Sequence, residues 1–206
     1  GGGGQGGEEQ GGAAGQGGSL PAGVFPLAGV SVDLPYEDLA PFGEMVGDAS
    51  LVGLGESIHT SGGFYAAKNR LIRYLVEQKG FRALAMETPR TDAEVTAAYV
   101  ATCEGTAKDA ARGFFSVFAD INAASLLEWL CSWNQQHPDD RVVFYGFDVQ
   151  QPWDDAPALH AFLDKTAPGE ASGLIESVEK ACDGALSGSA AAYYQNGLST
   201  IPEADH

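Results

Sequence analysis

A carboxylate and an imidazole lie three residues apart in the segment Gly55-Glu56-Ser57-Ile58-His59. A histidine that is hydrogen-bonded to a carboxylate becomes a better base near neutral pH. The chemistry that this pair suggests is activation of water by His59 for attack on a carbonyl or phosphoryl centre. The chain has 4 histidines, and the others occupy positions typical of an exposed turn, an ordinary helix and the end of the chain.

Short apolar segments of the chain lead to acidic residues at several points. They are 50–54 followed by Glu56, 81–86 followed by Glu87, and 141–147 followed by Asp148. These segments alternate with helical patterns, which predicts a mainly parallel sheet flanked by helices, an α/β fold. Parallel strands end at the same edge of a sheet, where ligands bind. We therefore expect these acids to meet His59 in loops at the carboxyl ends of the strands.

Each of these residues also has an ordinary structural interpretation. Glu56 can cap the following helix, and Glu87 can form a surface ion pair of little energetic value. Asp148 can begin a turn, and His59 can be a loop histidine without a chemical role. Their shared position at one edge of the predicted sheet favours a site when they are considered together.

A helix is predicted over residues 64–79 from its stripe of apolar residues at helical spacing. Arg70 and Arg73 fall off this stripe and are expected to face solvent, whereas Lys68 lies on it. A lysine on a buried face needs a carboxylate partner or a path to water. Lys68 either extends past the sheet edge into solvent or points into the site and pairs with Glu56. Its place in the first half of the helix favours the pairing.

Apolar patterns and turn residues along the rest of the chain predict further helices. They are expected over about 35–46, from Thr91 to about Cys103, over 121–135 and over 153–163, with weaker helical patterns over 170–186. Gly80 is expected to cap the helix that precedes it. The first 18 residues are Gly-rich and predict a disordered linker. Residues 19–206 are expected to form one domain, the N-terminal part of a larger one.

The composition excludes several classes of partner. The net charge is −17 with 28 acidic and 11 basic residues, which argues against nucleic acid and against anionic membrane surfaces. The sequence has no apolar run of about 18 residues, so we expect no transmembrane helix. The Gly-rich start is compatible with an exported or lipid-anchored protein, and a cytoplasmic location is the alternative.

The cysteines and the search for known motifs do not identify a function. Cys103 and Cys182 lie beside glycine-containing turns, so a bridge between them is an option, while Cys131 is expected to be a small core residue. We find no P-loop, no GxGxxG and no GxSxG motif. Glu56, His59, Glu87 and Asp148 are conceivable metal ligands, but one histidine is few for zinc. We predict no metal and no cofactor.

Separated stretches of the chain form a recognisable pattern. They read GESIHT, then GFYAAKNRLIRYLVEQKGFRALAME, then LLEWLCSWN, then RVVFYGFDVQ. In this order, over residues 50–152, they resemble the erythromycin esterase family. The resemblance implies an α/β fold with a deep cleft and hydrolysis of a small-molecule ester or lactone, with macrolide resistance as one outcome.

The same resemblance implies roles for individual residues. His59 matches the histidine that activates water, Glu56 the glutamate beside it, and Glu87 the strand-end glutamate of the site. Lys68 falls where characterised esterases carry an arginine, so it keeps the charge but lacks a planar, bidentate fork. Asp148 is expected to support the site.

Family members are about twice as long and supply further cleft histidines from their second half, which nothing in 153–206 matches. We therefore expect a hydrolase whose cleft is completed by further sequence. The alternative is a relative with the same fold and an incomplete site, which binds a metal, haem or another small ligand without catalysis. A third hypothesis is a cell-surface protein that descends from an enzyme and has kept only traces of its site. The sequence leaves the oligomeric state open.

Overall fold

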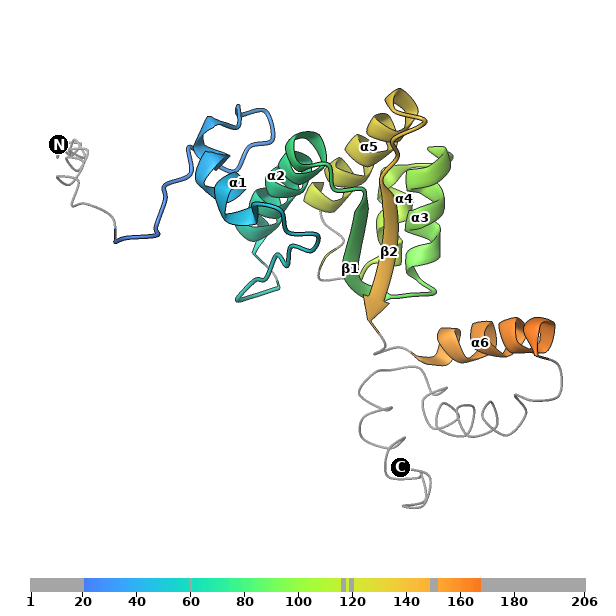
Figure 1. Ribbon diagram of the computed structural model, residues 1–206. Coiled ribbons are helices and arrows are strands. Elements are labelled where there is room, and N and C mark those ends of the chain that lie inside the picture. Colours follow the sequence, from blue (N-terminus) through green and yellow to red (C-terminus); the bar gives the residue numbers. More distant parts are fainter. Residues whose placement is uncertain (1–20, 60, 116–117, 119–120, 149–151, 168–206) are drawn as a thin grey trace, which may run out of the picture.

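The computed structural model describes residues 21–59, 61–115, 118, 121–148 and 152–167. The elements are, in chain order, η1 (Glu37–Leu39), α1 (Ala40–Val46), α2 (Gly62–Lys79), β1 (Ala83–Pro89), α3 (Ala93–Thr102), α4 (Ala107–Ala110), η2 (Ala111–Gly113), α5 (Ile121–Gln136), β2 (Val143–Asp148) and α6 (Pro152–Thr166). Figure 1 shows β1 and β2 side by side, with α3 and α5 packed beside them and α6 beyond their carboxyl ends. None of the helices that the structure describes has the length and apolar character that a membrane crossing needs.

The strands β1 and β2 pair in parallel, which confirms the predicted α/β class. Ala83 lies opposite Val143, and the register continues to Met86 opposite Gly146. A glycine is required at position 146, because a Cβ there would lie 2.6 Å from the carbonyl oxygen of Thr88. β1 continues to Pro89, so Glu87 lies inside the strand and not just after its end.

The predicted strand over residues 50–54 is wrong. These residues adopt no regular secondary structure, and within the described residues the sheet has two strands, β1 and β2. Residues 50–54 and residues of β1 line the same cavity, so the segment does not pair with the strand. A short apolar run meets the sequence criterion for a strand, but a strand also requires a backbone partner within hydrogen-bonding distance.

The core of the domain lies between the sheet and the helices on one of its faces. Val142, just before β2, and Phe144 of β2 point into it at 2% and 3% exposure, whereas Val143, Tyr145 and Phe147 alternate to the exposed face. This is the period of two expected for a strand with one buried face. The helical side of the core includes Val100, Phe114, Leu126, Leu127 and Leu130.

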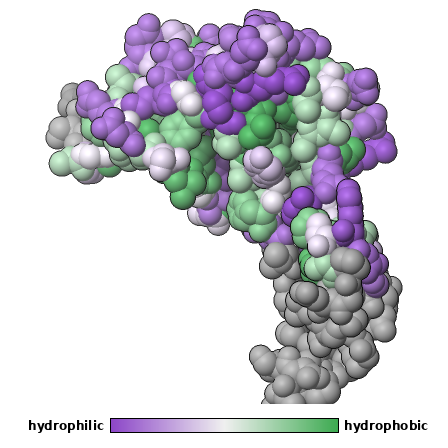
Figure 2. Space-filling view, turned by 45° about the vertical axis from the view of Figure 1, so that its right-hand side comes forward, coloured by the Kyte–Doolittle hydropathy of each residue, from purple (hydrophilic) through white to green (hydrophobic). Residues whose placement is uncertain are grey.

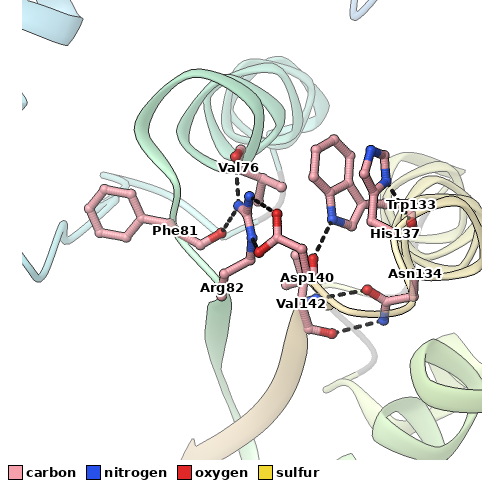
Figure 3. Close-up of polar contacts among 8 residues, drawn as sticks. All are labelled: Val76, Phe81, Arg82, Trp133, Asn134, His137, Asp140 and Val142. Atoms are coloured by element: carbon pink, nitrogen blue, oxygen red, sulfur yellow. Dashed lines mark hydrogen bonds and ion pairs between the residues drawn. The ribbon is translucent and has the colours of Figure 1, made fainter.

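A polar cluster joins the helices to the amino-terminal ends of the strands (Figure 3). Arg82 precedes β1, donates to the carbonyl oxygen of Val76 at the end of α2, and pairs with Asp140 before β2. Asn134 of α5 is 2% exposed and bonds to both the N–H and the carbonyl oxygen of Val142. Buried polar groups that are satisfied in this way favour one arrangement of neighbouring elements. This cluster therefore holds the end of the sheet that is opposite the predicted site.

Helix α2 begins at Gly62 and ends as predicted on Gly80, whose φ of 73° is left-handed and suits glycine. The prediction that Arg70 faces solvent is wrong, because this side chain is almost completely buried. It pairs with Asp38 and donates to the carbonyl oxygens of Gly29 and Pro35. A second segment of chain therefore covers α2 on the side away from its apolar stripe.

The ion pair between Arg70 and Asp38 attaches the lead-in segment to the domain. Hydrogen bonds from the guanidinium of Arg70 hold the pKa of Asp38 well below its usual range, although burial opposes this shift. Asp38 also accepts from the N–H of Ala28. The carboxylate thus stabilises the fold above the ordinary pKa of aspartate, and this contribution is lost as the pH falls through the lowered value.

A disulfide joins Cys103 and Cys131, which rules out the bridge between Cys103 and Cys182 that the sequence left as an option. Cys103 ends α3 with a φ of 60°, and Cys131 lies on α5, which packs against α3. This packing places the two Cα atoms 5.4 Å apart, within the range of a bridge. Cys131 also packs against the core, as expected.

Asp38→Asn tests the attachment of the lead-in segment. The variant is expected to lose about 3 kcal/mol of unfolding free energy at pH 7, because the charged Arg70 stays buried without its counterion. Glu94→Gln is the matched control, since the Arg90–Glu94 pair is 70% and 66% exposed and contributes little. Urea unfolding measures both variants. Equal, small losses would contradict the role of Asp38.

Peptide mapping without reductant tests the disulfide and is expected to recover Cys103 and Cys131 in one linked peptide. Cys131→Ser is expected to lower the unfolding free energy by about 3 kcal/mol, because the bridge closes a loop of 28 residues. Cys182→Ser is the control and should leave the linked peptide in place. A linked peptide that contains Cys182 would overturn the assignment.

Candidate active site

The carboxylate of Glu56 lies at the centre of a group of hydrogen-bond donors. Its Oε1 accepts from Nδ1 of His59 at 2.7 Å and from the hydroxyl of Tyr65 at 2.8 Å. Its Oε2 accepts from Nζ of Lys68 at 2.5 Å. The structure therefore confirms the interpretation in which Lys68 points inward and pairs with Glu56.

The side chain of Glu56 is 7% exposed, so its charge depends on these donors. Burial raises the pKa of Glu56, but hydrogen bonds from Lys68, His59 and Tyr65 outweigh it, and the net pKa is lowered. Glu56 is thus an ionised carboxylate at neutral pH with both oxygens engaged. A carboxylate in this state orients its neighbours and is poorly suited to take a proton itself.

The imidazole of His59 is held from two sides. Nδ1 contacts the ionised Glu56, so this nitrogen carries the proton and donates. Phe118 meets the ring in an edge contact, with ring centroids 5.2 Å apart. The side chain is 55% exposed, and no described residue bonds to Nε2. This leaves Nε2 as the nitrogen that can accept a proton from water.

Helix α2 supplies Tyr65 and Lys68 through its own geometry. Residues three apart lie on one face of a helix, so the phenol and the ammonium reach the same carboxylate. Tyr65 was missed in the sequence analysis, although a signal was present. A tyrosine placed one turn before an inward lysine needs a partner for its hydroxyl when it is buried, and Tyr65 is 9% exposed.

The loop from Gly55 to His59 opens on a cavity of about 1320 Å³ between residues 49–56, α2 and β1. Glu56, His59, Lys68 and Glu87 all line it, so the structure brings these predicted site residues to one space. Leucines and phenylalanines form much of the remaining lining. Figure 2 shows apolar surface in the middle and lower part of the folded body, below a more hydrophilic upper part. The site can therefore receive a large, mainly apolar molecule.

Asp148 does not join this group. It ends β2 opposite Pro89, as its strand-end position predicted, but it is not among the residues that line the cavity. Among the residues that the structure describes, no group of three or more His, Cys, Asp or Glu side chains is arranged to hold a metal ion. Glu87, in contrast, faces the cavity from β1.

Comparison with known proteins identifies the family to which the sequence is similar. The family model for erythromycin esterase matches residues 76–202, more than half of the chain. The match includes Glu87 and Asp148 and begins after Glu56, His59 and Lys68. The curated erythromycin esterase type II of Escherichia coli is 24% identical over 114 residues, which are 55% of this chain and 27% of that protein.

Solved structures share the fold. A succinoglycan biosynthesis protein is 26% identical with a TM-score of 0.64, over 82% of this chain and 43% of that one. An erythromycin esterase mutant in its open conformation is 22% identical with a TM-score of 0.62, over 84% of this chain and 42% of that one. The chain thus spans about a quarter of the curated relative and about two fifths of the similar structures.

Lys68→Met tests the electrostatic support of Glu56. At pH 7 the variant is expected to lose about 2 kcal/mol of unfolding free energy, because a buried carboxylate loses a charged donor. The loss should shrink as the pH falls through the lowered pKa of Glu56, since the stabilisation disappears as this carboxylate is protonated. Urea unfolding over a series of pH values measures this. Lys108→Met, on an exposed lysine of α4, is the control, and a loss independent of pH would contradict the pairing.

Proposed function

This chain belongs to the erythromycin esterase family, and we propose that it supplies the water-activating part of a hydrolase that cleaves an ester or lactone. The observation that carries this proposal is the hydrogen bond of 2.7 Å between Glu56 and Nδ1 of His59. It leaves Nε2 directed away from the carboxylate and accessible from the cavity. A neutral imidazole in this setting is a general base near pH 7.

In the proposed reaction, Nε2 of His59 takes a proton from a water molecule while the water oxygen attacks the ester carbonyl carbon. The ionised Glu56 stabilises the imidazolium that forms, because it accepts the Nδ1 proton in a charge-assisted hydrogen bond. When the tetrahedral intermediate collapses, the imidazolium returns the proton to the departing alkoxide oxygen. Water is consumed, one C–O bond is broken, and His59 ends in its starting form.

The remaining residues of the site receive supporting roles. Lys68 compensates the charge of Glu56, so that this carboxylate orients His59 and does not compete for its proton. Glu87 faces the same cavity, where its carboxylate can accept a hydrogen bond from the attacking water or from a hydroxyl of the substrate. Asp148 lies outside the cavity lining, and we propose for it only an indirect role at the carboxyl end of β2.

The proposed substrate is a small molecule that carries an ester or lactone on a bulky, apolar framework. The cavity volume of about 1320 Å³ and its apolar lining support this size and character. The curated relative in Escherichia coli is named an erythromycin esterase, which makes a macrolide lactone the first substrate to assay. The fold alone does not select a substrate.

A second candidate function is binding of a small apolar ligand without catalysis. The size of the cavity and its apolar lining favour it. The need for His59 distinguishes the two functions. A binding protein needs the apolar walls of the cavity but not the basic nitrogen, whereas a hydrolase needs both.

His59→Asn in the full-length protein tests the hydrolase. It is expected to lower kcat/KM for ester hydrolysis by about 10²–10⁴-fold, because the general base is lost while the Glu56 contact can be kept by the amide. His137→Asn is the matched control, since this ring stacks on Trp133 and bonds to its carbonyl oxygen. Hydrolysis that is unchanged in His59→Asn would overturn the proposal, and unchanged ligand affinity without hydrolysis in either protein would favour binding.

A further inference from the structure

We propose that Tyr65 is a positioning residue of this site, whose hydroxyl fixes Oε1 of Glu56 against His59 and limits how strongly that oxygen attracts the imidazole proton. The inference rests on the proposed function, because it assigns a control on the base of that reaction. In this role Tyr65 acts through Glu56, to which its hydroxyl donates.

The geometry places two donors on one oxygen. The hydroxyl of Tyr65 and Nδ1 of His59 both donate to Oε1, at 2.8 Å and 2.7 Å, while Lys68 occupies Oε2. The position of Tyr65 is itself determined by packing, because its side chain is 9% exposed and its ring lies against Phe118 with centroids 5.7 Å apart. Phe118 also contacts His59. One aromatic side chain therefore aligns both donors.

A hydrogen bond to a carboxylate oxygen lowers the affinity of that oxygen for protons. Oε1 with two donors attracts the Nδ1 proton less than Oε1 with His59 alone. If the phenol is removed, the negative charge on Oε1 acts on His59 undiminished and favours the imidazolium over the neutral ring. His59 would then become neutral, and able to accept a proton from water, only at higher pH.

The other charged groups around the site do not change with Tyr65. Lys68 faces Glu56 from α2, and Glu87 lines the same cavity from β1. Lys79 and Arg82 line the cavity as well, and Arg82 is paired with Asp140. The segment after η2 contributes the apolar Phe118. Removing the phenol oxygen takes away the hydrogen bond from Tyr65 to Oε1 of Glu56 and leaves these charged side chains in place.

The experiment is Tyr65→Phe in the full-length protein, with kcat/KM for ester hydrolysis measured against pH. The acid limb of the profile is expected to move to higher pH by roughly half a unit or more, and kcat to fall about tenfold with little change in KM. Tyr74→Phe is the matched control, because Tyr74 lies on the same helix and is also 9% exposed. It should leave the pH profile where it is.

NMR of the His59 ring gives a readout that needs no activity. The Nδ1–H proton of His59 is expected to resonate further downfield in Tyr65→Phe than in the parent protein, because its hydrogen bond to Oε1 becomes stronger when Oε1 loses its second donor. A more acidic phenol, 3-fluorotyrosine placed at position 65, keeps the shape and should move this resonance upfield. An unchanged resonance in both variants would overturn the role of Tyr65, whether or not the parent protein hydrolyses esters. Absent hydrolysis in the parent, with the shifts of this resonance present, would overturn the proposed function alone.

Discussion

The buried carboxylate of Glu56 is the group on which the rest of the site depends. A charge with 7% exposure of its side chain is costly unless donors surround it, and here Lys68, Tyr65 and His59 provide them. The requirement places α2 against the loop that carries Glu56. It also sets the orientation of His59, because the same oxygen that stabilises the fold accepts from Nδ1. Stability and chemistry thus share one interaction.

Helix α2 supports the site with one face and binds the lead-in segment with another. Tyr65 and Lys68 turn toward the cavity, while Arg70 turns to the lead-in segment and is held there by Asp38. A guanidinium with five donors can bind a carboxylate and two carbonyl oxygens at once. The lead-in segment and the site are therefore attached to one rigid helix, so the position of each constrains the other.

Much of the fold could be predicted from local patterns, and the errors share a cause. The helices and the parallel pairing of β1 with β2 follow from periodicity and turn residues, and Gly80 ends α2 as expected. Residues 50–54 have the composition of a strand but no backbone partner. Arg70 was expected in solvent because the sequence shows one apolar stripe on α2. The lead-in segment covers a second side of this helix and buries Arg70 there. The bridge between Cys103 and Cys131 could not be foreseen, because α3 and α5 meet only in the folded chain.

The sequence by itself determined the site's chemical groups: a glutamate and a histidine three residues apart, a lysine on the apolar stripe of the following helix, and a second glutamate at the end of an apolar segment. The pairing of Glu56 with His59 follows from spacing along the chain, because residues three apart in a loop stay close in space. Only the tertiary structure decided which donors meet Glu56, that Tyr65 is one of them, that Glu87 lines the cavity and Asp148 does not, and that Cys103 joins Cys131. Such choices depend on which buried surfaces pack together, and packing is not encoded in the spacing of any one segment.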